Sequence, residues 1–400
     1  MKLSKLSVIC MSIFSMLYFS ACKKNDPLST PQTAVSVDFT NPKDITAVVF
    51  SNTQIVFKEI NSGKTTSFSV EAGKALNVSL AEGSYDVSLD GDINYVDGTE
   101  KLTDKVSGYK QGVLINGDAY SFNLALFISH AKADFVIKEV FYTGTVTPEA
   151  KVYNGDKYFI IYNNTNETLY ADGLVIAEAA FVSTTKREYT PSIMSQAFSA
   201  GSLMMIPGDG TKYPVLPGKQ IVIANNAINH LEYNINSLDL TKADFEIPLI
   251  SSINVDNPQV TDLIGITSSM TMHNRGFKSY VLARLEKGQT VDAYKSANLY
   301  TYGYQNALGN TTNSTAYKIP NAQIIDAVNL SIPSGFEWIL TDPSLDKGWS
   351  YCGKVDQDAT RYGKSVRRKV SAIADGREIL KDTNNSTLDF EAEAKPSLMK

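Results

Sequence analysis

The sequence has little cysteine, little histidine and no excess of positive charge, and each shortage excludes a class of protein. Its 400 residues include 3 cysteines and 3 histidines, and the formal net charge is -5. So few cysteines exclude the disulfide framework by which small secreted domains compensate for a small core. A chain of net negative charge lacks the clustered Lys and Arg that contact a phosphate backbone. We therefore expect no nucleic-acid partner.

The chain also lacks an apolar run long enough to cross a membrane as a helix. The apolar run at residues 6–19 is shorter than the roughly 20 residues that a bilayer core requires. It follows Lys2 and Lys5 and precedes Ser20 and Ala21, which is the order of a secretory signal. A membrane anchor or an ordinary cleaved signal are the alternatives, but ordinary secretion leaves Cys22 unexplained at a new N-terminus.

Residues 17–22, Leu-Tyr-Phe-Ser-Ala-Cys, resemble a bacterial lipobox. The resemblance implies a signal peptide at residues 1–21, acylation of Cys22 and anchoring in the lipid of the outer membrane, where more than one acyl chain holds a protein stably. Residues 22–33 contain two prolines and no apolar periodicity, which predicts a tether. Lys23 and Lys24 stand where lipoproteins exported to the surface often carry acidic residues, so the sequence leaves open whether the protein faces the cell surface or the periplasm.

Loss of Cys10 with the signal and acylation of Cys22 leave Cys352 as the remaining thiol. No histidine neighbours Cys352 in the sequence, and a nucleophilic cysteine needs an adjacent base. The sequence therefore predicts a buried structural thiol at this position.

Short stretches that alternate apolar and polar residues predict a small β-sandwich over residues 34–130. These stretches lie at residues 47–50, 54–57, 67–70, 76–80, 85–89 and 120–124. Glycines after Asp or Glu, as in Asp90-Gly91 and Asp97-Gly98, predict hairpin turns between them. Residues 67–89 resemble the carboxypeptidase-regulatory or transthyretin-like sandwiches found at the N-termini of such lipoproteins.

The rest of the chain, residues 131–400, resembles an enlarged lamin-tail domain, which implies an immunoglobulin-like β-sandwich. The segments that carry the resemblance are residues 135–144, 157–164, 169–176, 216–224, 324–328, 365–368 and 381–390. A minimal lamin-tail domain is shorter, so we expect insertions near residues 177–213 and 238–280. The resemblance gives Arg367 or Arg368 a structural role in the closing strand. The expected fold class is therefore all-β, with two β-sandwich domains behind a signal and a tether.

This layout resembles an uncharacterised family of Gram-negative surface lipoproteins encoded beside outer-membrane receptors. The resemblance itself implies no activity. We expect a non-enzymatic binding or accessory subunit that presents its two domains to an unknown ligand or to a TonB-dependent receptor, without a cofactor. A surface adhesion or structural module is one alternative, and lamin-tail domains mainly mediate attachment. A surface hydrolase is the other, although the sequence has no Gly-x-Ser-x-Gly elbow.

Tyr300, Tyr302 and Tyr304 are the candidate ligand-binding residues. Side chains alternate along a strand, so the three rings share one face of an extended segment. Such a row can stack on a sugar ring, a porphyrin or a partner protein. Ordinary packing within a sheet is the alternative, because aromatic residues are common in strands.

The sequence predicts no metal site from its histidines. His130, His230 and His273 are far apart, whereas a catalytic zinc site usually has two ligands at local spacing.

Two pairs of carboxylates have a spacing that can share a calcium ion: Asp356 with Asp358, and Asp90 with Asp92. Neither pair continues into a calcium-binding loop with a closing Glu, and turn formation explains Asp-Gly pairs better.

We predict that Cys22→Ala leaves a soluble or unprocessed precursor, because the acylation site is lost. Cell fractionation and immunoblotting measure this. Membrane retention of a processed Cys22→Ala protein contradicts the lipid anchor.

Overall fold

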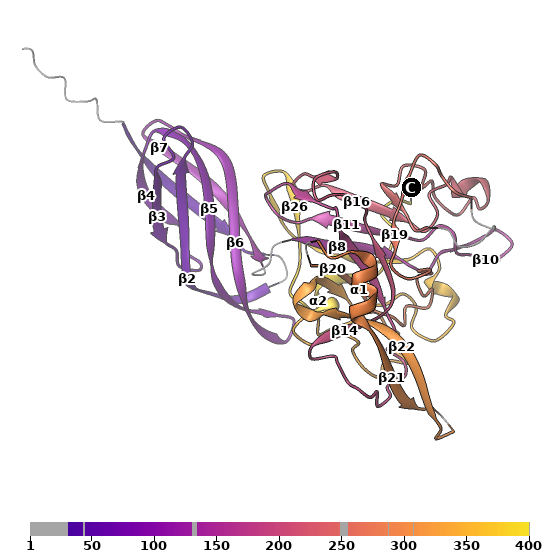
Figure 1. Cartoon of the computed structure of the whole chain (residues 1–400). Helices are drawn as coiled ribbons and strands as arrows, with labels where there is room; N and C mark the ends of the chain where they lie inside the picture. Colours follow the sequence, from indigo (N-terminus) through magenta and orange to yellow (C-terminus); the bar gives the residue numbers. More distant parts are fainter. Residues whose placement is uncertain are drawn as a thin grey trace, which may run out of the picture.

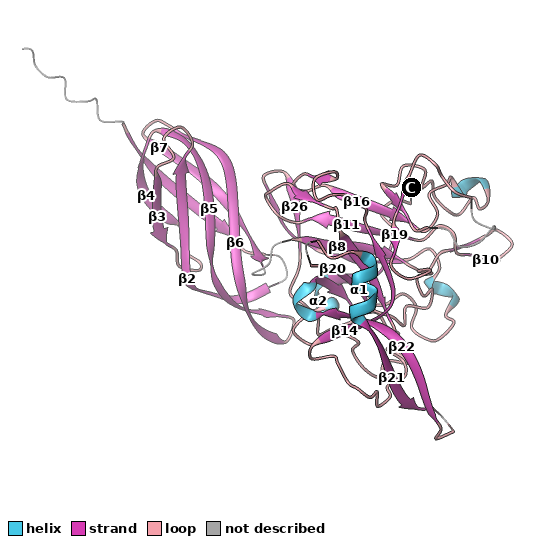
Figure 2. Ribbon diagram, in the orientation of Figure 1, coloured by secondary structure: helices cyan, strands magenta, loops and turns pink. Residues whose placement is uncertain are grey.

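A computed structural model of the chain describes residues 31–42, 45–129, 134–248, 255–286, 288–306 and 308–399. Two β-rich domains follow each other along the chain and lie side by side (Figure 1). Figure 2 shows strands throughout and only short helices. The expected all-β class with two sandwich domains is confirmed. Cys22 and His130 lie outside the described residues, and none of the described helices has the length and apolar character needed to span a bilayer.

The first domain is a sandwich whose two layers share one strand. Its sheet order is β3-β2-β5-β6-β7-β1-β4. The first part of β7, residues 119–125, pairs in parallel with β1, and residues 126–129 pair antiparallel with β6. The strands are β1 (Gln32–Thr40), β2 (Ile45–Glu59), β3 (Thr65–Ser69), β4 (Leu76–Ala81), β5 (Gly83–Asp97), β6 (Glu100–Ile115) and β7 (Ala119–Ser129).

Alternation of buried and exposed residues builds the core of this domain. In β5, Val87, Leu89 and Ile93 face inward while their neighbours face solvent. One expected turn is wrong: Asp90-Gly91 lies inside β5, where a Cβ on Gly91 would come within 2.1 Å of Thr53 Oγ1. Glycine is therefore required there by close packing, whereas Gly98, with φ of +61°, lies in the true hairpin turn.

The first domain also contains strand that the alternation did not indicate. β1 begins at Gln32, within the segment expected to be a tether, and Thr33 is fully buried. β6 pairs with β5 along its whole length, although residues 100–105, Glu-Lys-Leu-Thr-Asp-Lys, are mostly charged or polar. Residues 100–104 pair with β5 alone, and β7 joins β6 only from Lys105 onward, where the buried Val106 and Val113 supply the apolar face of the strand.

The second domain stacks two seven-stranded sheets. One has the order β18-β17-β16-β11-β8-β24-β27, and the other β21-β22-β14-β13-β20-β23 with β19 beside β14. The first sheet consists of β8 (Phe135–Phe141), β11 (Tyr158–Asn163), β16 (Gln220–Ala224), β17 (Phe245–Glu246), β18 (Thr261–Asp262), β24 (Ser365–Arg368) and β27 (Phe390–Ala394). The second consists of β13 (Leu174–Ala179), β14 (Ala197–Met205), β19 (Ile264–Gly265), β20 (Tyr280–Arg284), β21 (Leu299–Gln305), β22 (Thr311–Pro320) and β23 (Ile324–Val328).

Smaller elements connect these sheets. Two helices are α1 (Val291–Asn298) and α2 (Ser386–Asp389), and single 3-10 turns lie at His230–Glu232, Asn321–Gln323 and Ala359–Arg361. The short strand pairs are β9 (Thr145–Val146) with β10 (Val152–Tyr153), β12 (Leu169–Tyr170) with β15 (Pro214–Val215), and β25 (Val370–Ala374) with β26 (Arg377–Leu380).

The central strands of the second domain are buried on both faces. Every residue of β11 and of β13 is buried, which explains their nearly continuous apolar sequences. Phe159 and Ile176 belong to the core between the sheets, whereas Ile160 and Val175 belong to separate clusters on the outer faces. Loops and α1 therefore form additional layers over the sandwich.

The expected insertions contain structural strands as well as loops. Residues 177–213 include β14, whose Phe198 is buried and which pairs with both β13 and β22. Residues 238–280 include β17, β18 and β19, so this segment extends both sheets.

Arg368 links the two sheets of the second domain. Its guanidinium, on β24, binds both carboxylate oxygens of Asp326, on β23, at 2.7 Å each. It also donates to the carbonyls of Ile137 and Lys381, and Phe390 packs against its face at 4.6 Å. Arg368 has the structural role that the sequence predicted for this pair of arginines.

The hairpin of β25 and β26 joins the two domains. Ile379 and Ala372 form an apolar cluster with Tyr109 and Phe127 of the first domain. Beside this cluster, Lys381 forms a buried ion pair with Asp97.

We predict that Arg368→Ala lowers the free energy of unfolding by about 3–5 kcal/mol, because it leaves the buried Asp326 without its cation. The neighbouring Arg367→Ala is the control: Arg367 pairs with Glu391 near solvent, and its loss costs less than about 1 kcal/mol. Urea unfolding followed by circular dichroism measures both. Equal losses for the two variants contradict the assignment.

Candidate functional site

A helix and a long strand position the tyrosine row at the edge of the second sheet. Thr290 caps α1 by accepting a hydrogen bond from the Ala293 amide. Tyr294, fully buried on α1, donates to the Lys318 carbonyl of β22 at 2.7 Å. The chain then enters β21, which pairs with β22 over its whole length and forms the hairpin that extends from the sandwich in Figure 1.

The three predicted tyrosines lie on one face of β21. The ring centroids of Tyr300 and Tyr302 are 5.8 Å apart, and those of Tyr302 and Tyr304 are 6.3 Å apart. Tyr302 is buried, whereas Tyr300 and Tyr304 are half-buried. The tyrosine row is therefore partly accessible to solvent.

The loop of residues 180–196 covers this row. Thr190 forms an antiparallel bridge with Gly303, which fastens the loop to the edge of β21. Trp338 donates its indole N–H to the carbonyls of Val182 and Thr185, at 2.9 and 3.2 Å. The loop is thus held at Val182 and Thr185 by Trp338, and at Thr190 by β21.

The loop adds its own rings to the row. Tyr189 stacks on Phe181 with centroids 3.9 Å apart, and it lies 5.5 Å from Tyr302 and 5.8 Å from Trp338. Arg187 lies over Tyr304 at 4.5 Å, a cation–π contact. Together these residues form a cluster of aromatic side chains along β21.

A cavity of about 370 Å³ opens beside this cluster. Its floor is buried and its rim, which includes Lys186 and Glu188, is exposed. The aromatic residues on its wall are Phe181, Tyr189, Tyr300 and Trp338, and the other lining residues are Lys186, Arg187, Glu188, Pro191, Ser192, Ile193, Met194, Ala197, Ser199, Ile339, Leu340, Thr341 and Pro343. An apolar hollow of this size with a few polar groups has the usual form of a small-ligand site.

Polar groups reach the cavity from two sides. The hydroxyls of Ser199 and Tyr300 hydrogen-bond to each other at 2.5 Å. Burial raises the pKa of Tyr300, so its hydroxyl stays protonated and neutral at physiological pH. Lys186 supplies positive charge at the rim, and Glu188 is the single carboxylate among the lining residues.

Of the three predicted tyrosines, Tyr300 lines the cavity. Tyr302 and Tyr304 do not line the cavity, but their rings contact Tyr189, which does. Sequence reasoning missed Tyr189 and Phe181, although both lie in or beside the segment that it marked as an insertion. Trp338 has both an anchoring hydrogen bond and a place in the cavity wall.

The remaining candidate residues have separate structural partners. His230 Nδ1 lies 2.7 Å from the Tyr153 hydroxyl and its Nε2 lies 2.8 Å from the Asn226 carbonyl, and burial lowers its pKa. Burial also lowers the pKa of His273 to about 4. Both imidazoles are therefore neutral at physiological pH.

The two predicted carboxylate pairs are likewise engaged elsewhere. Asp356 forms an ion pair with Arg275 at 2.9 Å, and Asp358 accepts hydrogen bonds from the backbone at Lys354 and Thr360. In the first domain, Asp90 accepts from the Ser107 hydroxyl and Asp92 pairs with Lys105.

Two comparisons with known proteins lead to one uncharacterised family. Residues 216–397 match the model of a family described as "Protein of unknown function (DUF4876)". This match covers β21 and Trp338, and the loop of residues 180–196 lies outside it. No curated protein matches the chain.

A crystal structure of a DUF4876 family protein from Bacteroides thetaiotaomicron VPI-5482 has a similar fold, with a TM-score of 0.60. The two chains are 23% identical, and the similarity covers 91% of this chain and 95% of that one. It therefore extends over both domains.

We predict that Cys352 does not react with a thiol reagent in the native protein at pH 8. Cys352 is fully buried, and burial raises its pKa to about 12, so very little thiolate forms. Ellman's reagent measures this, with the urea-unfolded protein as the positive control. Rapid labelling under native conditions contradicts the assignment of a structural thiol.

Proposed function

We propose that the protein is a non-enzymatic binding lipoprotein of the outer membrane, held there by acylated Cys22, and that its aromatic cavity takes a small ring-bearing ligand. The observation that carries the proposal is the cavity beside Tyr300, with four aromatic side chains on its wall and a buried floor. Aromatic faces offer apolar contact at low entropic cost, and neighbouring hydroxyls fix orientation.

The geometry favours a sugar ring over the other ligands of an aromatic row. A cavity of about 370 Å³ lies near the lower end of the range for ligand pockets, roughly 300–1,000 Å³, which suits one or two rings rather than a large macrocycle. Ser199 and Tyr300 provide hydroxyls that can exchange their mutual hydrogen bond for bonds to a ligand. Lys186 at the rim suits an acidic substituent on the sugar.

Binding is supported over hydrolysis by the composition of the cavity wall. Cleavage of a glycosidic bond usually needs two carboxyl groups on opposite sides of the bond. The cavity wall offers Glu188 alone, and the buried Cys352 lies elsewhere, beside Tyr142. A retained ligand, passed on to a TonB-dependent receptor in the same membrane, fits this arrangement.

We also infer that the second sandwich is lamin-tail-like. Its support is the contact between the segments on which the resemblance rests: Asp326 on β23 meets Arg368 on β24, and Phe390 of β27 covers the arginine. This interpretation gives the domain a display role, with the cavity at one edge of its second sheet.

Intrinsic fluorescence tests the proposal, because the chain has only 2 tryptophans. Trp349→Phe leaves Trp338 as the single reporter on the cavity wall, and Trp349 stacks on Phe336 away from it. We predict that neutral or acidic mono- or disaccharides shift the Trp338 emission, and that adding Tyr300→Ala weakens binding about tenfold, or roughly 1.4 kcal/mol.

Tyr170→Ala is the matched control, since Tyr170 is 41% exposed and does not line the cavity. It should leave the affinity unchanged. Absence of any emission change across the saccharide panel, or equal affinity of the Tyr300→Ala and parent proteins, contradicts the proposal.

A further inference from the structure

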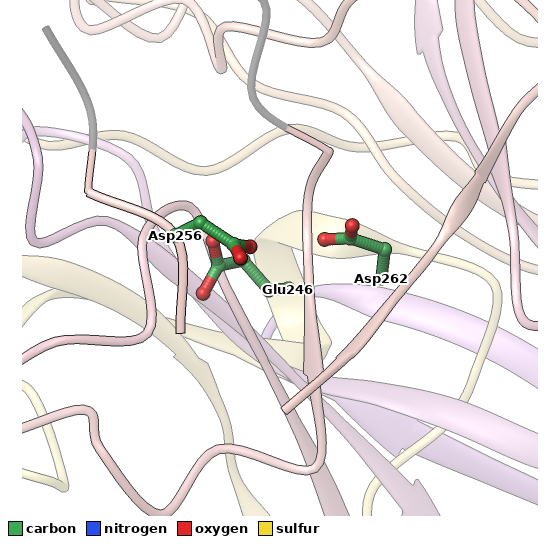
Figure 3. Close-up of side chains that lie close together, drawn as sticks. All are labelled: Glu246, Asp256 and Asp262. Carbon is green, nitrogen blue, oxygen red and sulfur yellow. The ribbon is translucent and has the colours of Figure 1, made fainter. Parts of the chain in front are cut away.

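Three carboxylates converge at the edge of the first sheet of the second domain, on a different sheet from the aromatic cavity. They belong to Glu246 on β17, Asp262 on β18, and Asp256 in the irregular segment before β18. β17 and β18 pair in parallel with Glu246 directly opposite Asp262, so both side chains lie on the same face. One oxygen from each of the three groups lies within 4.8 Å of the others, and Figure 3 shows the carboxylates facing one another.

Backbone hydrogen bonds hold this arrangement in place. Glu246 Oε2 accepts a hydrogen bond from the Ala227 amide at 2.8 Å, and Asn257 donates to the Ala227 carbonyl at 2.8 Å. A single residue of the neighbouring loop thus fixes both Glu246 and the segment that carries Asp256. The carboxylates are brought together by the fold rather than by chance contact of mobile side chains.

The buried member of the group is incompletely satisfied. Glu246 is fully buried, and its Oε1 has no hydrogen-bond partner among the described residues. Leaving a buried carboxylate oxygen unpaired is costly. Among the ion pairs of the described residues, none joins a Lys or Arg to any of the three groups. Burial raises the pKa of Glu246 to about 7, and the charges of Asp262 and Asp256 add to this effect.

We propose that Glu246, Asp256 and Asp262 bind one calcium ion. Calcium takes six to eight oxygen ligands at roughly 2.3–2.6 Å, so oxygens on opposite sides of the ion are about 5 Å apart. Carboxylate oxygens within 4.8 Å of one another can therefore share an ion with little movement. Asp256 and Asp262 are exposed, and water completes the coordination.

Calcium suits this site better than magnesium. Magnesium requires near-ideal octahedral geometry at a shorter distance and gives up its water reluctantly, whereas calcium accepts irregular sets of carboxylates. The ion ties together β17 and β18, which share only two residue pairs, and so strengthens the edge of the sheet. This structural cation is independent of ligand binding in the aromatic cavity.

Calorimetric titration of the purified full-length protein, freed of metal with a chelator, tests the proposal. We expect calcium to bind with a Kd of roughly 10⁻⁴–10⁻³ M, the range of extracellular modules. Glu246→Gln and Asp262→Asn should each weaken binding at least tenfold. Asp356→Asn is the matched control, because Asp356 pairs with Arg275 in solvent and should leave the Kd unchanged.

Thermal unfolding in chelator and in calcium separates lost binding from misfolding. Glutamine retains an oxygen that can accept from the Ala227 amide, and the substitution removes repulsion between like charges. Glu246→Gln should therefore be at least as stable as the parent in chelator, yet gain nothing from calcium. The proposal is overturned if calcium neither binds nor raises the melting temperature of the parent, if both substitutions retain the parent affinity, or if magnesium binds as tightly.

Discussion

The second domain depends on one buried cation. Arg368 stands on one sheet and binds Asp326 on the other through two hydrogen bonds of 2.7 Å, and both side chains are almost completely buried. A buried charge is tolerated only when its partners replace water, and here Arg368 also donates to the carbonyls of Ile137 and Lys381 and to the carboxylate of Asp382. This contact joins the two sheets, whose facing apolar side chains form the main core of the domain.

Arg368 is also connected to the boundary between the domains, through Lys381. The carbonyl of Lys381 accepts a hydrogen bond from Arg368, and its ammonium forms an ion pair with Asp97 of the first domain. The hairpin of β25 and β26 adjoins it and covers Tyr109 with apolar and cationic groups. The first sandwich is therefore fixed to the part of the second that Arg368 already orders, and the two domains form a continuous structure.

The aromatic cavity and the carboxylate cluster both lie at sheet edges. An edge strand has unpaired backbone groups that natural proteins usually cover. The loop of residues 180–196 covers β21 through Thr190 and leaves a hollow beside Tyr300. At the opposite sheet, the short strands β17 and β18 end the sheet and bring Glu246 and Asp262 together. Both sites therefore lie where the regular pairing of strands in a sheet ends.

The sequence by itself determined the all-β class, the shared face of Tyr300, Tyr302 and Tyr304, and the buried character of Cys352, because each depends on local alternation or on nearby residues. It could not place Asp90-Gly91 inside a strand, because glycine is required there by the close approach of Thr53, which lies on another strand. Only the tertiary structure decided the cavity wall and the carboxylate cluster, because their members are separated along the chain and meet through long-range pairing that no local pattern encodes.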